Sequence, residues 1–266
     1  MVKLGLLRKV SRSLQTVGLQ ETFIRIVRYP FIPFTQRRLE ERIFRHRSIE
    51  DRFTEIYKLN YWSSRESVSG AGSKLANTEN LRKNLPLLIE KFGIRSIFDA
   101  PCGDFNWMKH VVSRSGLEYT GGDIVAPLIE SLIHNYGDEK TKFVHLDITK
   151  DKFPSADIMI CRDSLFHLSF ADTVLALRIF VRSEIPFLLT STHLNTSKFE
   201  NKDIITGAFR FIDLFSAPYN FPRDVYYRIS DALEEGKETE VCLWGRDQIA
   251  AALKSFAENK FQKTIM

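Results

Sequence analysis

From Thr78 to residue 256, stretches with helical and with strand-like spacing of apolar residues alternate along the chain. Such alternation is typical of a parallel sheet with helices packed on its faces. The pattern predicts helices over residues 78–92, 106–114, 128–133, 174–181 and 246–256. It predicts strands over residues 94–99, 117–123, 142–146, 156–161, 187–191 and 240–244.

Several of the predicted helices carry residues that favour a helix end. Thr78 stands where an N-cap is expected, and Gly93 follows the last apolar position of the same helix. Pro86 lies inside this helix and disfavours an unbroken one. Ser169 and Asp172 have the spacing of a capping box, so we expect a helix to begin there.

The first 60 residues have a helical pattern that Pro30 and Pro33 interrupt. One predicted face is an apolar stripe with basic residues around it; the stripe consists of Leu7, Val10, Leu14 and Val17. Such a helix suits a membrane surface, and it equally suits packing on the domain or on a second subunit. We therefore divide the chain into a basic helical extension, residues 1–60, and a domain of residues 61–266.

Composition places the chain among ordinary soluble proteins, with 44% hydrophobic and 27% charged residues over 266 positions. We find no run of 18 apolar residues and no apolar segment followed by a small-residue cleavage site, so we expect neither a transmembrane helix nor a signal peptide. Cys102, Cys161 and Cys242 lack metal-site spacing and suit reduced thiols. We expect a cytoplasmic protein, or one peripheral on the inner face of the membrane.

The positive charge is concentrated in the extension. Residues 1–50 contain eleven Lys and Arg against four Asp and Glu, whereas the whole chain has a net charge of +5. The extension is therefore the part expected to contact a membrane surface or to form a dimer, and we expect no specific nucleic-acid partner.

Candidate ligand-binding residues follow the predicted strands, at the edge where open α/β sheets bind ligands. The turn 99–104 contains Gly103, and a tight turn there aims backbone amides at a ligand. Asp123 lies 20 residues after Gly103, where a carboxylate can accept hydrogen bonds from both ribose hydroxyls. Asp147 can accept from an adenine amino group, with Ile148 against the ring.

The order of these residues resembles that of class I S-adenosylmethionine-dependent methyltransferases over residues 75–245. The family's Asp/Glu-x-Gly-x-Gly-x-Gly motif falls on residues 99–105, where only Gly103 is kept and Pro101 and Phe105 replace glycines. S-adenosylmethionine has no phosphate, so its site tolerates this less open turn, and the lost glycines argue against a pyrophosphate-binding dehydrogenase. The string 99–108 (DAPCGDFNWM) resembles a bacterial subgroup, near methyltransferases of surface-polysaccharide assembly.

The resemblance implies an α/β, Rossmann-like, doubly wound and mostly parallel seven-stranded sheet with helices on both faces. It also implies S-adenosyl-L-methionine as cofactor, with the segment before the first domain helix closing over its methionine end. The residues that we assign to the cofactor are Tyr61, Trp62, Ser69, Gly70, Asp99, Ala100, Pro101, Cys102, Gly103, Trp107, Asp123, Ile124, Asp147, Ile148, Cys161 and Arg162.

Transfer of a methyl group to a hydroxyl requires an aligned acceptor and a base for its proton. His167 follows the fourth predicted strand and His193 the fifth, and either can accept a proton near neutral pH. We assign His167 as the base and His193 as the alternative. Asp163 can orient a histidine, hold a cation or pair with Arg162. The Asn/Asp-Pro-Pro-aromatic sequence of base N-methyltransferases is absent from residues 162–165, which favours an oxygen acceptor. We predict no metal site.

The aromatic region 195–235 lies where this fold places its acceptor-binding elements. Arg210, Tyr219 and Asn220 can bind a polar acceptor there, and packing over the sheet edge is the alternative. We therefore predict O-methylation of a glycan or glycolipid hydroxyl. Two other hypotheses remain open: a methyltransferase for a protein or small molecule, and a nucleic-acid-binding protein with a degenerate cofactor site.

Overall fold

The computed structural model describes residues 32–231 and 238–254. The chain forms two compact units, Met1–Arg47 and Ser48–Met266. In the first, helix α2 (Ile32–Phe44) is described, and Pro33 lies in its first turn, where proline is tolerated. Pro30 and the apolar stripe Leu7–Val17 predicted for the extension lie outside the described residues. The sequence placed the end of the extension at residue 60, whereas the compact units divide between Arg47 and Ser48.

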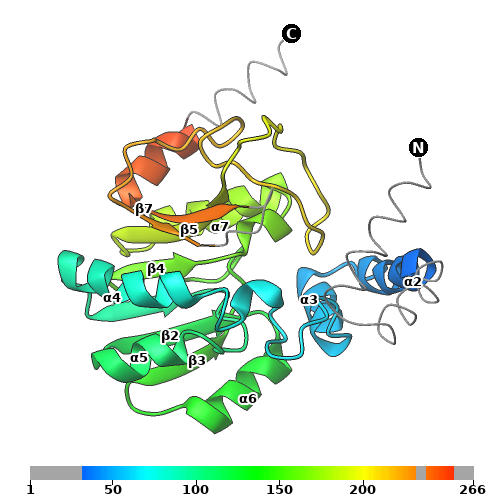
Figure 1. Cartoon of the computed structure of the whole chain (residues 1–266), viewed down its shortest axis with the longest axis horizontal. Helices are drawn as coiled ribbons and strands as arrows, with labels where there is room; N and C mark the ends of the chain where they lie inside the picture. The colour runs from blue at the N-terminus through cyan, green and yellow to red at the C-terminus, as the bar shows by residue number, and fades with distance from the viewer. Residues whose placement is uncertain (1–31, 232–237, 255–266) are drawn as a thin grey trace, which may run out of the picture. The chain divides into compact units, whose positions relative to one another are not determined.

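The second unit contains one seven-stranded sheet with the order β3-β2-β1-β4-β5-β7-β6 (Figure 1). Its strands are β1 (Ser96–Asp99), β2 (Glu118–Asp123), β3 (Thr141–His145), β4 (Ile158–Cys161), β5 (Phe187–His193), β6 (Tyr227–Ser230) and β7 (Thr239–Gly245). Strands β1 to β5 pair in parallel, and β7 runs antiparallel to both β5 and β6. The predicted Rossmann-like, mostly parallel sheet is therefore confirmed.

The two faces of the sheet are covered by two separate apolar clusters. Apolar residues of α4 (Glu79–Phe92), α5 (Lys109–Ser115) and α6 (Ala126–Tyr136) share one cluster with Ile97 and Ile160. Those of α7 (Phe170–Arg182) and of the helical residues 246–254 share the other with Phe98 and Met159. Successive side chains of a strand point to opposite faces, so β1, β4, β5 and β7 each supply apolar residues to both clusters.

The structure confirms one of the two N-caps that the sequence predicts. Ser169 caps α7, because its hydroxyl accepts a hydrogen bond from the amide of Asp172 at 3.1 Å. Thr78 occupies the N-cap position of α4, but its hydroxyl donates to the carbonyl of Lys74 and caps no amide. Pro86 lies within α4 without ending it.

The sequence pattern missed strand β6 and placed the start of α5 too early. Of the four residues of β6, only Ile229 is buried, so this edge strand has almost no apolar pattern. Helix α5 begins at Lys109 instead of residue 106, because the preceding residues form turns. Within that turn Asn106 donates to the carbonyl of Ser73, which ties it to a distant segment.

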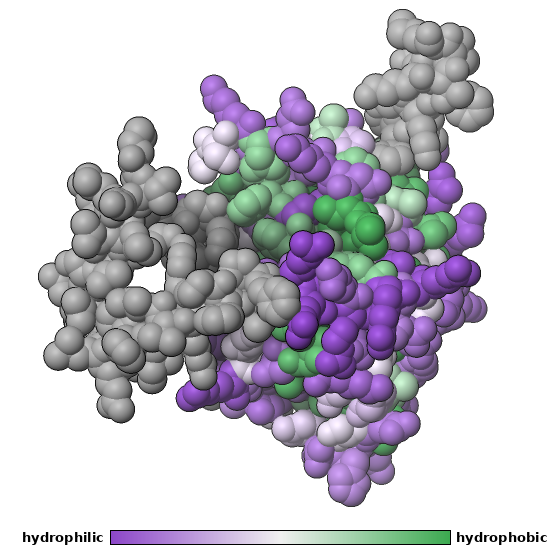
Figure 2. Space-filling model, turned by 90° about the vertical axis from the view of Figure 1, so that its right-hand side faces the viewer, coloured by the Kyte–Doolittle hydropathy of each residue, from purple (hydrophilic) through white to green (hydrophobic). Residues whose placement is uncertain are grey.

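None of the described helices has the length and apolar character needed to cross a membrane. Figure 2 shows mostly hydrophilic residues on one face of the molecule, with apolar residues in separate patches.

The cap of α7 gives a direct test of local stability. We expect Ser169→Ala to lower the free energy of unfolding by about 1 kcal/mol, because the Asp172 amide loses its acceptor. Urea unfolding followed by circular dichroism measures the change. Ser155→Ala, at an exposed serine outside any helix, is the matched control. Equal losses in both variants would show that the cap contributes nothing.

Candidate active site

A cavity of about 520 Å³ opens at the carboxyl ends of the parallel strands. Ligands in open α/β sheets bind at this edge, and the volume is in the range of small-molecule sites. Thirteen of the sixteen residues predicted to bind the cofactor line it: Trp62, Ser69, Gly70, Asp99, Pro101, Cys102, Gly103, Trp107, Asp123, Ile124, Asp147, Ile148 and Arg162. The three predicted catalytic residues, Asp163, His167 and His193, line it as well.

Three predicted cofactor residues do not line the cavity. Ala100 and Cys161 are buried in the apolar cluster beneath α7, because the alternation of the strand turns their side chains to that face. Tyr61 is half-buried and outside the cavity, although the adjacent Trp62 lines it.

The turn after β1 approaches the cavity through its backbone. Gly103 has φ +55°, and its amide donates to the carboxylate of Asp123 at 3.1 Å. A Cβ at this position would lie 2.3 Å from Oγ of Ser69, so the turn requires glycine both for its conformation and for the close approach. The neighbouring Phe105 also has a positive φ, and its ring packs on Tyr119 with centroids 4.9 Å apart.

Asp104 holds the segment before α4 against this turn. Its carboxylate accepts hydrogen bonds from the hydroxyl of Ser67 at 3.0 Å and from the amide of Val68 at 2.9 Å. The amide of Asp104 in turn donates to Oγ of Ser69 at 2.9 Å. The segment that the resemblance predicted to close over the cofactor therefore forms part of the cavity wall.

Two carboxylates at the ends of β2 and beyond β3 face the cavity with acceptor capacity remaining. Asp123 accepts from the amides of Gly103 and Val125, one at each oxygen, and a carboxylate has about four acceptor sites. Asp147 accepts at Oδ1 from the amide and hydroxyl of Thr149 and has Lys150 3.3 Å from Oδ2. Burial raises the pKa of Asp123 from its ordinary value, against the lowering effect of its amide donors.

Asp99, at the end of β1, is a buried carboxyl beside the same cavity. Its Oδ2 accepts a hydrogen bond from the hydroxyl of Tyr119 at 2.8 Å. Burial raises the pKa of Asp99 to about 7, and the Tyr119 hydrogen bond and the nearby Arg162 charge only partly offset this effect. Burial therefore favours the protonated, neutral form of this carboxyl.

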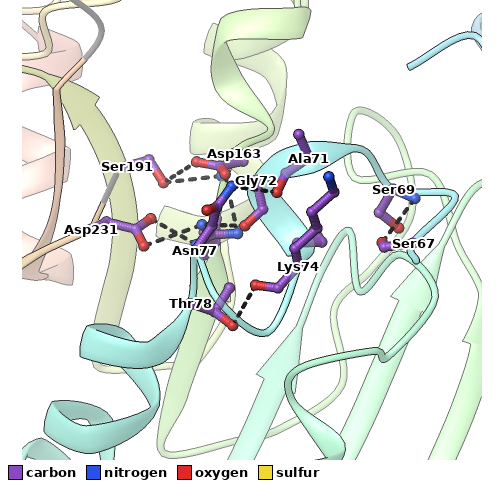
Figure 3. A network of polar contacts seen from close by, with 12 residues as sticks. Ser67, Ser69, Ala71, Gly72, Lys74, Asn77, Thr78, Asp163, Ser191 and Asp231 are labelled. Carbon is purple, nitrogen blue, oxygen red and sulfur yellow. Dashed lines mark hydrogen bonds and ion pairs between the residues drawn. The ribbon is translucent and has the colours of Figure 1, made fainter. Parts of the chain in front are cut away.

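Arg162 is a buried cation that joins three segments. Figure 3 shows its partners Gly72, Asp163 and Asp231 gathered at one place. Its guanidinium donates to both oxygens of Asp231, at 2.7 and 3.1 Å, and to the carbonyl of Gly72 at 3.0 Å. It also lies 3.1 Å from Oδ2 of Asp163 and over the ring of Trp107, 5.5 Å from its centroid. Burial raises the pKa of Asp231 to about 6 even beside this cation.

The remaining oxygen of Asp163 is held by β5. Oγ of Ser191 donates to Oδ1 of Asp163 at 3.0 Å and accepts from the Asp163 amide at 3.0 Å. The backbone of Asp163 has a φ of +52°. In this conformation the residue makes both hydrogen bonds with Ser191 and the contact with Arg162. Gly72 packs against it so closely that a Cβ would lie 2.8 Å from Oδ2.

His167 and His193 face the cavity from η2 (Leu165–His167) and from the end of β5. Nδ1 of His167 lies 2.8 Å from the carbonyl oxygen of Ala208, which can only accept, so this nitrogen carries a proton. In the neutral ring, Nε2 of His167 is then free to accept a proton. Burial lowers the pKa of both histidines, which favours their neutral forms.

The residues predicted to bind the acceptor lie elsewhere. Arg210 is buried and donates to the hydroxyl of Tyr219 at 2.6 Å, to Thr173 and to the carbonyl of Leu165. Tyr219 is also buried, and Asn220 is exposed outside the cavity. Arg210 and Tyr219 therefore hold the long segment after β5 onto α7, and we assign none of the three a contact with the acceptor.

The sequence reasoning missed one wall of the cavity. Ile49, Phe53 and Tyr57 of α3 (Ile49–Lys58) line it, although the sequence placed them in the extension. Their spacing of four residues puts them on one helix face, a signal that was present in the sequence. The other lining residues outside the prediction are Val68, Ala71, Gly72, Ser73, Val125, Leu128, Leu146, Thr149, Ser164, Phe166, Leu168, Phe209 and Thr239.

Within residues 32–231 and 238–254, no three His, Cys, Asp or Glu side chains are grouped as ligands of a metal ion. The three cysteines are buried and unpaired with one another. Burial raises the pKa of Cys161 to about 12, so this thiol stays protonated.

Comparisons with known proteins find similarity in structure but not in sequence. No protein-family model and no curated protein matches the chain. Solved structures that resemble it include a magnesium protoporphyrin IX methyltransferase from Synechocystis PCC 6803 with bound SAH, at 10% identity and a TM-score of 0.49, covering 72% of this chain and 93% of that one. Human N-acetylserotonin methyltransferase in complex with SAM has 15% identity and a TM-score of 0.45, covering 90% and 65%. An N-methyltransferase from Bradyrhizobium japonicum WM9 has 10% identity and a TM-score of 0.48, covering 63% and 94%.

These neighbours are methyltransferases with different substrates. Their identities to this chain are at most 15% and their TM-scores are below 0.5.

Arg162 and Asp231 form a buried ion pair, so truncation of the Asp231 side chain should strongly destabilise the protein. We expect Asp231→Ala to lower the free energy of unfolding by about 3–5 kcal/mol, because the guanidinium loses its bidentate acceptor within the protein. Denaturant unfolding measures the change. Glu79→Ala, which removes an exposed ion pair with Lys83, is the matched control and should cost far less. A small loss in Asp231→Ala would contradict the assigned role.

The raised pKa of Asp99 predicts a pH dependence of stability. Between its ordinary pKa of 3.8 and about 7, Asp99 holds a proton in the folded but not in the unfolded chain. Its contribution to stability is therefore complete below pH 3.8 and is lost as the pH rises through about 7. We expect the stability of Asp99→Asn relative to the native chain to increase over this range and to level off above it. Urea unfolding at several pH values tests this, and a constant difference would contradict it.

Proposed function

We propose that this protein transfers the methyl group of S-adenosyl-L-methionine to a hydroxyl of a glycan or glycolipid precursor. The observation that carries the proposal is the convergence, on one cavity, of Gly103, the Asp123 carboxylate and the Nε2 atom of His167. The first two suit a nucleoside, and the third suits proton removal from an acceptor.

The residues at the ends of β1 to β3 fit the adenosyl part of the cofactor. Asp123 has acceptor sites left for two ribose hydroxyls after binding the amides of Gly103 and Val125. Oδ2 of Asp147 can accept from the adenine amino group, and Ile148 and Leu128 supply apolar contacts for the ring. The tight approach of Ser69 to Gly103 leaves no open glycine-rich loop of the kind that surrounds a pyrophosphate.

The methionine part is expected beside the segment that Asp104 and Arg162 hold in place. Asp99 in its ionised form can bind the cofactor's ammonium group, and Trp107 and Trp62 also line the cavity. Bound S-adenosylmethionine would supply an activated methyl carbon, with its bond to sulfur breaking as the bond to the acceptor oxygen forms and a neutral thioether as the leaving group.

His167 is the group that we assign to the acceptor proton. Its Nδ1–H is held by the carbonyl of Ala208, so its Nε2 atom accepts the hydroxyl proton as the oxygen attacks. Asp163 lies near His167, and its negative charge stabilises the resulting imidazolium. The protein thus supplies alignment and a base, which are the two requirements of an in-line transfer to oxygen.

The acceptor side of the cavity favours an uncharged molecule with an apolar face. Rings surround His167, with centroid distances of 5.2 Å to Trp62, 4.6 Å to Phe166 and 6.0 Å to Phe209. Arg162 is the one Lys or Arg side chain among the described lining residues, and its guanidinium already has carboxylate and carbonyl acceptors. A sugar ring meets these conditions, because it combines hydroxyls with a C–H face that packs on aromatic rings.

The location of the enzyme follows from its proposed acceptor. A glycolipid precursor would bring the protein to the inner membrane surface, with residues 1–50 as the contact or as a dimerisation segment. Within the described part of this segment, α2 carries Arg37, Arg38 and Arg42. Membrane contact and dimerisation are both proposals.

Cofactor binding provides the primary test. We expect the native chain to bind S-adenosylhomocysteine and Asp123→Ala to bind it at least about tenfold more weakly, because hydrogen bonds to a charged group are lost. Isothermal titration calorimetry measures both. Asp224→Ala, which removes an exposed carboxylate away from the cavity, should bind like the native chain. The absence of binding to the native chain would refute the proposal.

Removal of the base should separate catalysis from cofactor binding. We expect His167→Gln to reduce kcat for methyl transfer by about 10²–10⁴-fold while leaving S-adenosylhomocysteine affinity unchanged. Because burial lowers the pKa of His167, kcat at saturating S-adenosylmethionine should rise with pH through a value below the ordinary histidine pKa and then stay constant. Assays with labelled S-adenosylmethionine and a panel of methyl glycosides test this. An unchanged kcat in the variant would exclude His167 as the base.

A further inference from the structure

The two histidines of the cavity are held in opposite tautomers. Nδ1 of His167 lies 2.8 Å from a carbonyl oxygen and must donate, so its Nε2 atom accepts. Nδ1 of His193, in contrast, accepts a hydrogen bond from the amide of Ile212 at 3.2 Å. A neutral His193 therefore carries its proton on Nε2 and can only donate there.

Backbone geometry holds His193 in this state. The amide of His193 donates to the carbonyl of Ile212 at 2.8 Å, while the amide of Ile212 donates back to the imidazole. The ring also packs edge-on against Phe211, with centroids 5.1 Å apart. His193 is 5% exposed, and this burial disfavours its charged form. Burial and the Ile212 amide thus favour a neutral His193 whose Nε2 atom carries the proton.

The acceptor and the donor lie on the same side of the cavity. The imidazoles of His167 and His193 both contact Phe166, with centroid distances of 4.6 and 5.3 Å. Both also lie 6.0 Å from the ring of Phe209, which is half exposed. Both imidazoles therefore border the part of the cavity beside Phe209, where one small molecule would face both of them.

We propose that His193 binds a second oxygen of the acceptor, next to the hydroxyl that His167 deprotonates. This inference rests on the proposed function and narrows its substrate class to a ring with two oxygens on adjacent carbons. The Nε2–H group of His193 donates to the second oxygen, which accepts whether it is a hydroxyl, an ether or a carbonyl. His193 is then a residue that selects and positions the acceptor and does not remove its proton.

The tautomers can be measured without any acceptor. Two-bond ¹H–¹⁵N correlation spectra of the full chain, labelled at histidine, identify the protonated nitrogen of each ring, and His167→Gln and His193→Gln assign the signals. At pH 7 we expect the proton on Nδ1 of His167 and on Nε2 of His193. A proton on Nδ1 of His193, or an imidazolium there at pH 7, would overturn the proposal.

The adjacent-oxygen requirement can be measured with small probes. cis-Cyclohexane-1,2-diol and cis-cyclohexane-1,4-diol contain the same groups and differ in whether the oxygens are adjacent. With S-adenosylhomocysteine present, we expect the 1,2-diol to shift the His193 Nε2–H signal and to bind about 2–10-fold more tightly, the range of one neutral hydrogen bond. In His193→Phe this preference should disappear. Equal affinities in the native chain, no binding of either diol, or a preference kept in His193→Phe would contradict the proposal.

These measurements distinguish a failure of the His193 proposal from a failure of the methyltransferase proposal on which it rests. Failure of S-adenosylhomocysteine to bind would refute the methyltransferase proposal itself. Normal S-adenosylhomocysteine binding with the wrong His193 tautomer, or without a preference for the 1,2-diol, would refute only the role of His193.

Discussion

Arg162 connects parts of the chain that are far apart in sequence, and the cavity depends on it. The end of β4 supplies the arginine, the segment before α4 supplies the Gly72 carbonyl, and the residue after β6 supplies the Asp231 carboxylate. A buried guanidinium requires such acceptors, because desolvation of an unpaired charge costs several kcal/mol. The same requirement therefore positions the cavity wall, Asp163 and Trp107.

The cavity owes its chemistry to the direction of the strands. Because β1 to β5 are parallel, the residues at their carboxyl ends meet at one edge, and polar side chains such as Asp99, Asp123 and His193 gather there. Asp99 and Asp123 are buried there, and burial raises the pKa of each. A site with several carboxylates and one occupied guanidinium suits a cationic cofactor better than a phosphate-containing one.

Much of the fold and of the proposed cofactor site could be predicted from the sequence, since strand ends follow from apolar periodicity. Asp123 and Asp147 were located by this reasoning alone.

The acceptor contacts could not be predicted. Arg210 and Tyr219 are buried and hydrogen-bonded to each other, and no local sequence pattern reveals this pairing. The wall formed by Ile49, Phe53 and Tyr57 was missed because a boundary was drawn after a helix that belongs to the domain. The different states of His167 and His193 depend on the carbonyl of Ala208 and the amide of Ile212, which only the folded chain brings to them.

The central claim is that one cavity holds an adenosyl group at Asp123 and an acceptor at His167. A crystal structure of the full chain with S-adenosylhomocysteine tests it most directly. We expect ribose hydroxyls bonded to the Asp123 carboxylate, the adenine beside Asp147 and Ile148, and the sulfur facing the space in front of Nε2 of His167. Density for S-adenosylhomocysteine at any other site, or with its ribose away from Asp123, would contradict the account.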